Sequence, residues 1–375
     1  MASAMIFHNE PLRNLLDGFH AERGFPGATA AIACDNGVLT AATGFADPDD
    51  GTPMTARSVM LQASVGKMYV GAVAMSLVQA GALEIDAPIA RYLGDRAWFV
   101  RLPNGTNLTL RHLLNHSAGL HDYMHLPAFA PAAAALLSDP NIYHAPEALI
   151  DFILDHPPLF APGEDFAYTD AAFLVAGLIL EAVSGQTYYD LVRRLFLEPW
   201  QLRETFAANS RNIPGLVPGF RGPNPIGLPR RSMEGGLLTL HPGSEWTGGG
   251  WASTSADMAR FTQRLLGGPD SRYRNAVIAW GQGATSPVAG TYGLGVLASD
   301  STLGERYGHG GWTPGYRSDV HCYPDHGMSV AVMVNGDDPA CASGDDLLAF
   351  GLRIATAAVE MGLVQRGGLN ACLSA

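Results

Sequence analysis

Strand-like patterns occur towards the two ends of this 375-residue chain, and a long strand-poor stretch separates them. Near the N-terminus, two apolar runs flank Asp35-Asn36-Gly37, a pattern typical of a β-hairpin. From about 84 to 285 short helices and Pro/Gly-rich loops dominate, and short apolar runs separated by turn residues return near 292. This order indicates one sheet built from both ends of the chain, with a helical insertion between them.

We therefore predict an α+β fold, in which an antiparallel β-sheet is flanked by N- and C-terminal helices at 9–23 and about 344–361. The sheet lobe is discontinuous and comprises 1–83 and 286–375, whereas 84–285 forms an inserted, mostly α-helical lobe. We expect the active site between the two lobes, because ligand sites often lie at such boundaries.

Charge and apolar patterning limit the class of protein. The formal net charge of −12 argues against nucleic-acid and membrane-surface partners, because such anionic partners bind proteins through basic patches. The most apolar stretches, 68–80 and 171–180, are shorter than a membrane span, and the first residues lack the pattern of a signal peptide. The four cysteines do not have the spacing of metal ligands. We expect a cytoplasmic protein with reduced thiols, no metal and no cofactor, whose oligomeric state the sequence leaves open.

The chain contains a single lysine, Lys67, among its 23 Lys and Arg residues. Arginine stays charged, whereas a buried lysine can lose its proton and act as a base. Ser64 precedes Lys67 by three residues, which places both side chains on one face of a helix. This S-x-x-K pattern indicates a nucleophile beside its base. The alternative is a helix N-cap serine followed by a solvent-facing lysine.

Two further motifs supply the other parts that such a site needs. Tyr168-Thr169-Asp170 precedes the predicted helix 170–185 and offers a group that relays protons to the leaving atom. His309-Gly310-Gly311 lies in a predicted C-terminal strand, where glycines would let a substrate approach the strand backbone.

These three motifs, in this order and at this spacing, resemble the serine β-lactamase/penicillin-binding-protein superfamily. The closest resemblance is to its class C β-lactamase-like branch, which includes family VIII esterases, D-aminopeptidases and D-amino acid amidases. The resemblance covers nearly the whole chain. It is carried by LTLRHLLNHSAGLHDY (108–123), the stretch from FAYTD to EPWQL (166–202), GGGWASTSADMARFTQRLLGG (248–268) and YGHGGWTPGYRS (307–318).

The resemblance implies roles for individual residues. Ser64 would attack an acyl carbonyl and form an acyl-enzyme, while Lys67 and Tyr168 would share general-base and general-acid duty. Which of the two takes the first proton stays open. The backbone N–H groups of Ser64 and Trp312 would hold the oxyanion. The expected substrate-binding residues are Tyr123, Asp170, His309, Gly310 and Gly311.

Two positions depart from the family pattern. Asp170 stands where β-lactamases usually have Asn, and it could pair with Lys67, receive a substrate amine or hydroxyl, or cap helix 170–185. His309 replaces the lysine with which penicillin-recognising enzymes commonly hold the substrate carboxylate, and Arg317 is the remaining candidate for that task. These departures favour other acyl substrates over β-lactams.

We therefore predict a serine hydrolase that cleaves a small ester or amide through a Ser64 acyl-enzyme, with a family VIII-type carboxylesterase as the first choice. A D-stereospecific aminopeptidase or amidase, or a transacylase, would use the same site. A true β-lactamase and a catalytically silent binding protein fit less well. His112 and His116 have the i, i+4 spacing of zinc ligands. They fall in a segment whose family role is mainly structural, so we predict no metal site.

Overall fold

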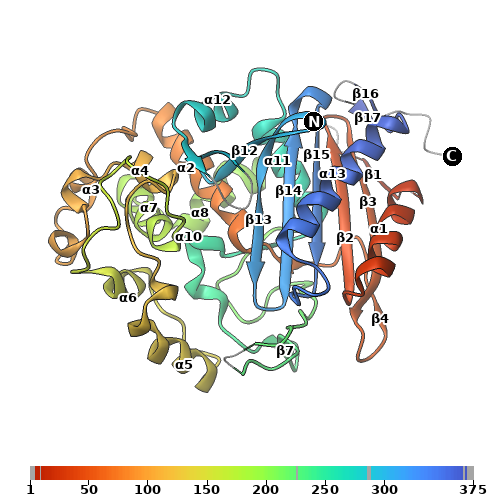
Figure 1. The fold of residues 1–375 in the computed structure, drawn as a ribbon, viewed down its shortest axis with the longest axis horizontal. Helices are drawn as coiled ribbons and strands as arrows, with labels where there is room; N and C mark the ends of the chain where they lie inside the picture. The colour runs from red at the N-terminus through yellow and green to blue at the C-terminus, as the bar shows by residue number, and fades with distance from the viewer. Residues whose placement is uncertain (1–4, 9, 225–226, 285–288, 366–367, 370–375) are drawn as a thin grey trace.

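The computed structural model describes residues 5–8, 10–224, 227–284, 289–365 and 368–369. A ten-stranded sheet dominates it, with the order β1-β3-β2-β15-β14-β13-β12-β11-β10 and with β4 paired to β3 (Figure 1). Its strands are β1 (Met5–His8), β2 (Gly27–Cys34), β3 (Gly37–Asp47), β4 (Thr52–Pro53), β10 (Gln282–Ala284), β11 (Gly290–Gly293), β12 (Val296–Ser301), β13 (Gly304–Thr313), β14 (Tyr316–Tyr323) and β15 (Met328–Val334).

The two ends of the chain meet in the middle of this sheet, where β2 pairs with β15. This confirms the predicted fold class, and the hairpin around Asn36 is formed by β2 and β3. One strand differs from the antiparallel prediction, because β1 pairs with β3 in parallel. A parallel neighbour requires a crossover connection, and α1 (Glu10–Arg23) lies between β1 and β2 in the chain.

Helices cover both faces of the sheet. On one face lie α1 and α13 (Gly344–Glu360), and on the other lies α11 (Ser255–Leu266) (Figure 1). The strands alternate accordingly: Val330 and Val332 of β15 join the core beneath α1 and α13, whereas Ala331 and Met333 join the core on the α11 side. The predicted terminal helices are thus confirmed, each with one apolar face buried.

The helical lobe lies beside the sheet edge that carries β10 to β13 (Figure 1). Two apolar helices, α2 and α7, pack against each other at its centre. The α-helices of this lobe are α2 (Lys67–Gln79), α3 (Ala90–Leu93), α4 (Leu110–Leu114), α5 (Ala130–Ser138), α6 (Pro146–Ile150), α7 (Asp170–Ser184), α8 (Tyr188–Val192), α9 (Glu198–Trp200) and α10 (Trp246–Gly249). A further helix, α12 (Arg272–Ala279), packs beside β11.

Short strands join the segments around the lobe. β5 (Met60–Leu61) and β6 (Phe206–Ala207) both pair with β9 (Trp251–Ser253). Separate two-stranded pairs are β7 (Met233–Glu234) with β8 (Leu237–Leu238), and β16 (Val364–Gln365) with β17 (Gly368–Leu369).

The predicted division into 1–83 with 286–375 and 84–285 stays a prediction. Its second boundary, between 285 and 286, lies outside the described residues. Helix α11 comes from within the predicted insertion, yet it packs on β2, β14 and β15. A cut of the chain at two points therefore does not separate the helices that cover the sheet from those of the helical lobe.

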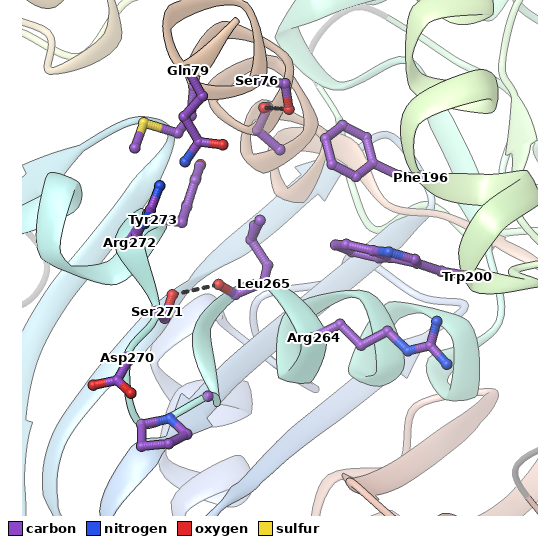
Figure 2. Close-up of a pocket in the computed structure, with 14 residues that line it drawn as sticks. Ser76, Gln79, Phe196, Trp200, Arg264, Leu265, Asp270, Ser271, Arg272 and Tyr273 are labelled. Carbon is purple, nitrogen blue, oxygen red and sulfur yellow. Dashed lines mark hydrogen bonds between the residues drawn. The ribbon is translucent and has the colours of Figure 1, made fainter. Parts of the chain in front are cut away.

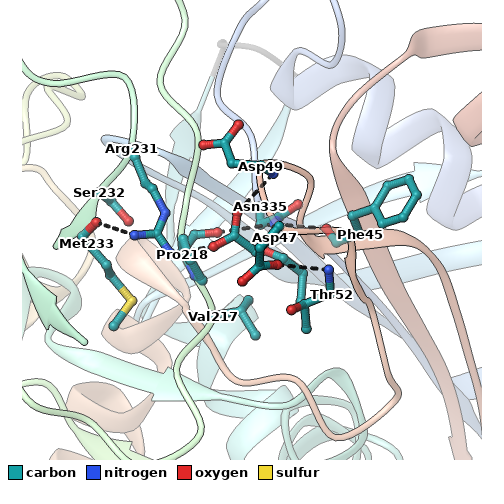
Figure 3. A network of polar contacts seen from close by, with 12 residues as sticks. Phe45, Asp47, Asp49, Thr52, Val217, Pro218, Arg231, Ser232, Met233 and Asn335 are labelled. Carbon is teal, nitrogen blue, oxygen red and sulfur yellow. Dashed lines mark hydrogen bonds and ion pairs between the residues drawn. The ribbon is translucent and has the colours of Figure 1, made fainter. Parts of the chain in front are cut away.

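A polar network ties the returning end of the insertion to the sheet (Figure 3). Asn335, just after β15, donates from Nδ2 to the carbonyl oxygens of Ala46 at 3.0 Å and Pro218 at 3.1 Å. Nearby, Arg231 forms an ion pair with the buried carboxylate of Asp47. These contacts join β3 and the end of β15 to Pro218 and Arg231.

Among the described residues no single helix is both long and apolar enough to cross a membrane, and only the pair Asp170–Ser184 and Tyr188–Trp200, bent by 73°, meets that requirement together. Cys34, Cys322 and Cys341 are free thiols, and Cys372 lies outside the described residues. The cytoplasmic location stays a prediction.

Helix α2 leaves no room for a side chain where it crosses the turn between β11 and β12. A Cβ atom on Gly71 would lie 1.9 Å from the carbonyl oxygen of Leu294 and 2.4 Å from the hydroxyl of Tyr273. We expect Gly71→Ala to lower the free energy of unfolding in urea by about 3 kcal/mol or more, because backbone has to move to admit the methyl group. Gly18→Ala in α1, where no atom lies within 4 Å of the new Cβ, should instead stabilise the protein by roughly 0.5–1 kcal/mol. Equal effects of the two substitutions would contradict the close approach of α2 to this turn.

Candidate active site

The S-x-x-K segment lies where a short strand turns into a helix. After β5, the 3₁₀-helix η1 (Ala63–Gly66) leads directly into α2, which begins at Lys67. Ala63 has a φ of +50°, a left-handed conformation that a residue with a Cβ rarely adopts. This turn brings the partly exposed Ser64 to the start of a buried helix, with Lys67 on the same side.

Lys67 is fully buried, and its amine contacts Ser64. Its Nζ donates to Ser64 Oγ at 3.1 Å and to the carbonyl oxygen of Gly248 at 2.6 Å. The solvent-facing lysine considered above is therefore wrong. So is the capping serine, because Gln62 and Gly66 hold the N-cap positions of η1 and α2.

Asp170 is the third partner of this lysine. Its carboxylate forms an ion pair with Lys67, and its side chain is 12% exposed. The helix cap is instead Thr169, whose Oγ1 accepts a hydrogen bond from the N–H of Ala171 at 3.1 Å. Of the three roles considered for Asp170, capping of α7 is thus excluded, and pairing with Lys67 is what the structure shows.

Tyr168 reaches the same serine from the other side. Its hydroxyl lies within interaction range of the Ser64 side chain, and its ring centre lies 5.0 Å from Lys67 Nζ. Although 40% of the residue is exposed, its hydroxyl end lies within this cluster. Burial and the charge of Asp170 raise the pKa of Tyr168 well above its usual value. Tyr168 is therefore a neutral phenol near pH 7, ready to donate a proton.

His309 on β13 has no free ring nitrogen. Its Nδ1 lies 2.5 Å from the carbonyl oxygen of Gly310, and its Nε2 lies 2.8 Å from the hydroxyl of Tyr292. Because a carbonyl only accepts, Nδ1 carries the proton and Nε2 accepts from Tyr292. Burial and the charge of Lys67 lower the pKa of His309 to about 3, so the ring is neutral. A direct hydrogen bond from His309 to a substrate would require one of these contacts to break.

Close packing, and not the expected access of a substrate to the strand, explains the glycine at position 311 beside His309. A Cβ on Gly311 would lie 2.2 Å from the carbonyl oxygen of Gln62 and 2.4 Å from Ser318 Oγ. At Gly310 the nearest atom, in Asp319, would be 3.6 Å away. Gly311 therefore lets β13 pack against the backbone that precedes Ser64, and Gly310 has room for a methyl group. Substrate contact by either glycine stays a prediction.

The packing of β13 against η1 joins the two segments that carry the expected oxyanion-hole residues, Ser64 and Trp312. Ser318 Oγ donates to the carbonyl oxygen of Gln62 at 2.6 Å, which ties the β13–β14 hairpin to the segment before Ser64. Trp312, the residue after Gly311, is 54% exposed. This arrangement is compatible with a hole formed by the N–H groups of Ser64 and Trp312, which stays a prediction.

Arg317 does not replace the missing lysine of the third motif. It neighbours Ser318 on β14, so their side chains point to opposite faces of the sheet. Ser318 faces the Ser64 segment, whereas the Arg317 guanidinium donates to the carbonyl oxygen of Asp337 at 3.2 Å. Lys67 is thus the cation that the structure places at Ser64.

Sequence reasoning missed two carboxylic acids that interact with Asp170. Burial and the charge of Asp170 raise the pKa of Glu245 to about 7, while Lys67 acts in the opposite direction. Burial and Asp170 likewise raise the pKa of Asp122, which precedes the predicted substrate residue Tyr123. Tyr123 is 6% exposed and within electrostatic reach of the same carboxylates. No motif marks Glu245, which is a lone acid in a loop that tertiary packing brings to the site.

The raised pKa of Glu245 gives a stability prediction. A carboxyl group with a higher pKa folded than unfolded stabilises the fold below its unfolded pKa, and that stability is lost as pH rises from about 4.5 through 7. We expect Glu245→Gln to unfold like the parent at pH 4.5 and to be roughly 2 kcal/mol more stable at pH 8. Urea unfolding at both pH values checks this. A stability difference independent of pH would contradict it.

The histidine pair with zinc-like spacing does not converge. His112 Nδ1 contacts the N–H of Thr109 at 3.2 Å, whereas His116 Nδ1 accepts from the N–H of Thr169 at 3.3 Å. Over the ranges that the structure describes, no group of three or more His, Cys, Asp or Glu side chains is placed to hold a metal ion.

A separate cavity of about 450 Å³ lies on the outer side of α2 and is not the catalytic site (Figure 2). Trp200, Arg264 and Tyr273 are among its lining residues. Neither Ser64 nor Lys67 is among them.

Known proteins of one family resemble this chain over most of its length. The family model described as Beta-lactamase matches residues 12–352. Penicillin-binding protein 4* of Bacillus subtilis (strain 168) is 25% identical over 87% of this chain and 72% of its own. A D-aminopeptidase of Cereibacter sphaeroides is 26% identical over 87% of this chain and 60% of its own. Esterase EstB of Burkholderia gladioli is 29% identical over 63% of each chain.

The same fold occurs in a solved structure of a D-stereospecific amidohydrolase from Streptomyces sp.. The TM-score is 0.76 at 24% identity, over 91% of this chain and 97% of the other. With the family match over most of its length, this chain belongs to the Beta-lactamase family and is a serine hydrolase of that fold.

Proposed function

We propose that the protein hydrolyses small carboxylic esters through an acyl-enzyme on Ser64. One observation carries the proposal: Ser64 Oγ is contacted by both Lys67 Nζ, at 3.1 Å, and the Tyr168 hydroxyl. A hydroxyl held between an amine and a phenol can lose a proton to one side, while the other side supplies a proton to the leaving group.

The resting state needs one proton shift before the attack. Lys67 donates to Ser64 and to Gly248 and forms an ion pair with Asp170, and an ammonium in this position has no lone pair with which to accept a proton. Tyr168 is protonated as well, so neither group can accept the Ser64 proton. We infer that a Lys67 proton moves to the Asp170 carboxylate, which leaves a neutral amine beside Ser64.

Acylation then proceeds with balanced protons. Ser64 Oγ bonds to the carbonyl carbon, its proton passes to the Lys67 amine, and the carbonyl electrons move to the oxyanion. Collapse of the intermediate breaks the bond to the leaving alkoxide, which takes the Tyr168 proton. Lys67 returns a proton to Tyr168. In deacylation, water attacks the acyl-enzyme, its proton passes to the Lys67 amine, and Ser64 leaves with the Tyr168 proton. The carboxylic acid is released, and Lys67 again returns a proton to Tyr168.

The charges around Ser64 favour esters over penicillins. A penicillin brings a carboxylate, and this site has no third-motif lysine, while Asp122, Asp170 and Glu245 lie nearby. Like charges in a partly buried site repel each other, and a neutral ester avoids that cost.

A substrate panel tests the proposed function. We expect kcat/KM for a short-chain p-nitrophenyl ester to exceed that for benzylpenicillin by at least about a hundredfold, since a missing charge-assisted contact and added repulsion each cost about a decade. Ser64→Ala should remove turnover of both and block labelling by a fluorophosphonate probe. Penicillin turnover at or above about 10⁵ M⁻¹s⁻¹ in the parent would reverse the assignment.

A second candidate is a D-stereospecific aminopeptidase or amidase. The carboxylates of Asp122 and Glu245 near Lys67 would attract the free ammonium group of an amino-acid amide. The relative named D-aminopeptidase, at 26% identity, supports this alternative. In the same panel, D-amino acid amides turned over faster than uncharged esters of equal size would favour it.

A further inference from the structure

His116 is a buried residue that the mechanism above does not use. It follows α4, is 0% exposed, and has a φ of +59°. Its ring lies against the ring of Tyr168, with 4.2 Å between the centroids. On its other sides are the rings of Tyr292, at 4.7 Å, and Phe173, at 5.1 Å. His116 therefore forms part of the wall behind the proposed acid.

His116 also holds the backbone on both sides of Tyr168. Its carbonyl oxygen accepts a hydrogen bond from the N–H of Ala167 at 2.9 Å. Its Nδ1 accepts from the N–H of Thr169 at 3.3 Å. One residue thus fixes the position before Tyr168, the position after it, and the face of its ring. His116 makes these two hydrogen bonds, through its carbonyl oxygen and its side chain, in a left-handed backbone conformation.

His116 cannot itself exchange protons with the reacting atoms. Because Nδ1 accepts from Thr169, the ring proton is on Nε2, and Nε2 has no hydrogen-bond partner among the described residues. Burial, and after it the charge of Lys67, lowers the pKa of His116 well below its usual value, so the ring stays neutral. A protonated ring would turn a donor towards the Thr169 N–H.

We propose that His116 is a positioning residue that holds the Tyr168 hydroxyl at the distance and angle needed to protonate a leaving group. The inference rests on the proposed function, in which Tyr168 is the acid. Because 40% of Tyr168 is exposed, contacts on its inner side have to fix it. A displacement of about 1 Å can lower the rate of such a step by about a hundredfold.

The test compares two esters with the same acyl group, an ethyl ester and a p-nitrophenyl ester. The alkoxide needs a proton from Tyr168 to leave, whereas p-nitrophenolate does not. We expect His116→Phe, which keeps a ring but loses the Nδ1 acceptor, to lower kcat/KM for the ethyl ester by about tenfold. His116→Asn, which suits a positive φ but removes the ring, should lower it by about a hundredfold. For the p-nitrophenyl ester both variants should stay within about threefold of the parent.

Two controls separate positioning from stability. Active enzyme is counted by fluorophosphonate titration of Ser64, so that misfolded protein does not enter kcat/KM. His112→Asn changes a half-buried histidine one turn earlier, whose Nδ1 bonds to Thr109 instead of the Tyr168 segment. It should change kcat/KM for both esters by the same small factor, because loss of stability does not distinguish leaving groups.

The outcomes distinguish this inference from the proposed function. Equal losses on both esters in the His116 variants, an unaffected ethyl ester, or no titratable Ser64 in either variant would assign His116 to folding and overturn the inference. Tyr168→Phe, measured alongside, should lower kcat/KM for the ethyl ester by about a hundredfold. If Tyr168→Phe turns over the ethyl ester normally, the assignment of Tyr168 as the acid fails instead.

Discussion

Lys67→Arg is expected to lower kcat/KM for an alkyl ester by about four orders of magnitude, close to the loss in Ser64→Ala. Guanidinium keeps the positive charge beside Asp170 but cannot give up a proton near neutral pH, so Ser64 loses its base. Residues that act as one catalytic unit are not additive, and for this reason removal of either member costs about as much as removal of both. Steady-state rates of the two single variants and the double variant check this.

The volume of arginine is a concern in this fully buried pocket, so a companion variant is needed. Lys67→Met has nearly the volume of lysine and no charge, and it should be equally inactive. Denaturant midpoints of both variants show whether the fold persists. Turnover of the alkyl ester by Lys67→Arg within a few-fold of the parent would mean that Lys67 serves only as a cation, and the proposed mechanism would fail.

Asp170→Asn is expected to lower kcat/KM for the alkyl ester about a hundredfold near pH 7, with recovery as the pH rises. In the proposed mechanism, Lys67 passes a proton to the Asp170 carboxylate with which it forms an ion pair, so the active form needs no net loss of a proton. In the variant the ammonium has to release that proton to solvent, which becomes favourable only at alkaline pH. The measurement is the pH dependence of kcat/KM between about pH 5 and 10.

Glu245→Gln is the matched control, because it removes a neighbouring carboxylate that the structure does not pair with Lys67. It should show no alkaline recovery. The opposite shift in Asp170→Asn, with activity retained and extended towards acid pH, would show that Lys67 loses its proton directly to solvent. Asp170 would then only stabilise the ammonium.

Local patterns predicted the elements that build the sheet and its flanking helices. The short apolar runs of β14 and β15 and the turn at Asn36 are properties of neighbouring residues, so they are readable without a structure. The parallel pairing of β1 was missed because parallel strands meet only after a crossover, and nothing in four residues specifies their partner. Likewise, α11 has one clear apolar face, but its sequence does not say which lobe that face covers.

The sequence by itself determined which residue types meet at the site. One lysine three residues after a serine, followed by the tyrosine and His-Gly-Gly motifs, carried the resemblance to the family. The i, i+3 spacing puts Ser64 and Lys67 on one helical face. Only the tertiary structure decided what surrounds them. Gly248 and Asp170 reach Lys67 from segments far apart in the chain, and His309 is neutral because burial and the charge of Lys67 lower its pKa. Charge state and partner choice depend on burial and on long-range contacts, and neither is a property of neighbouring residues.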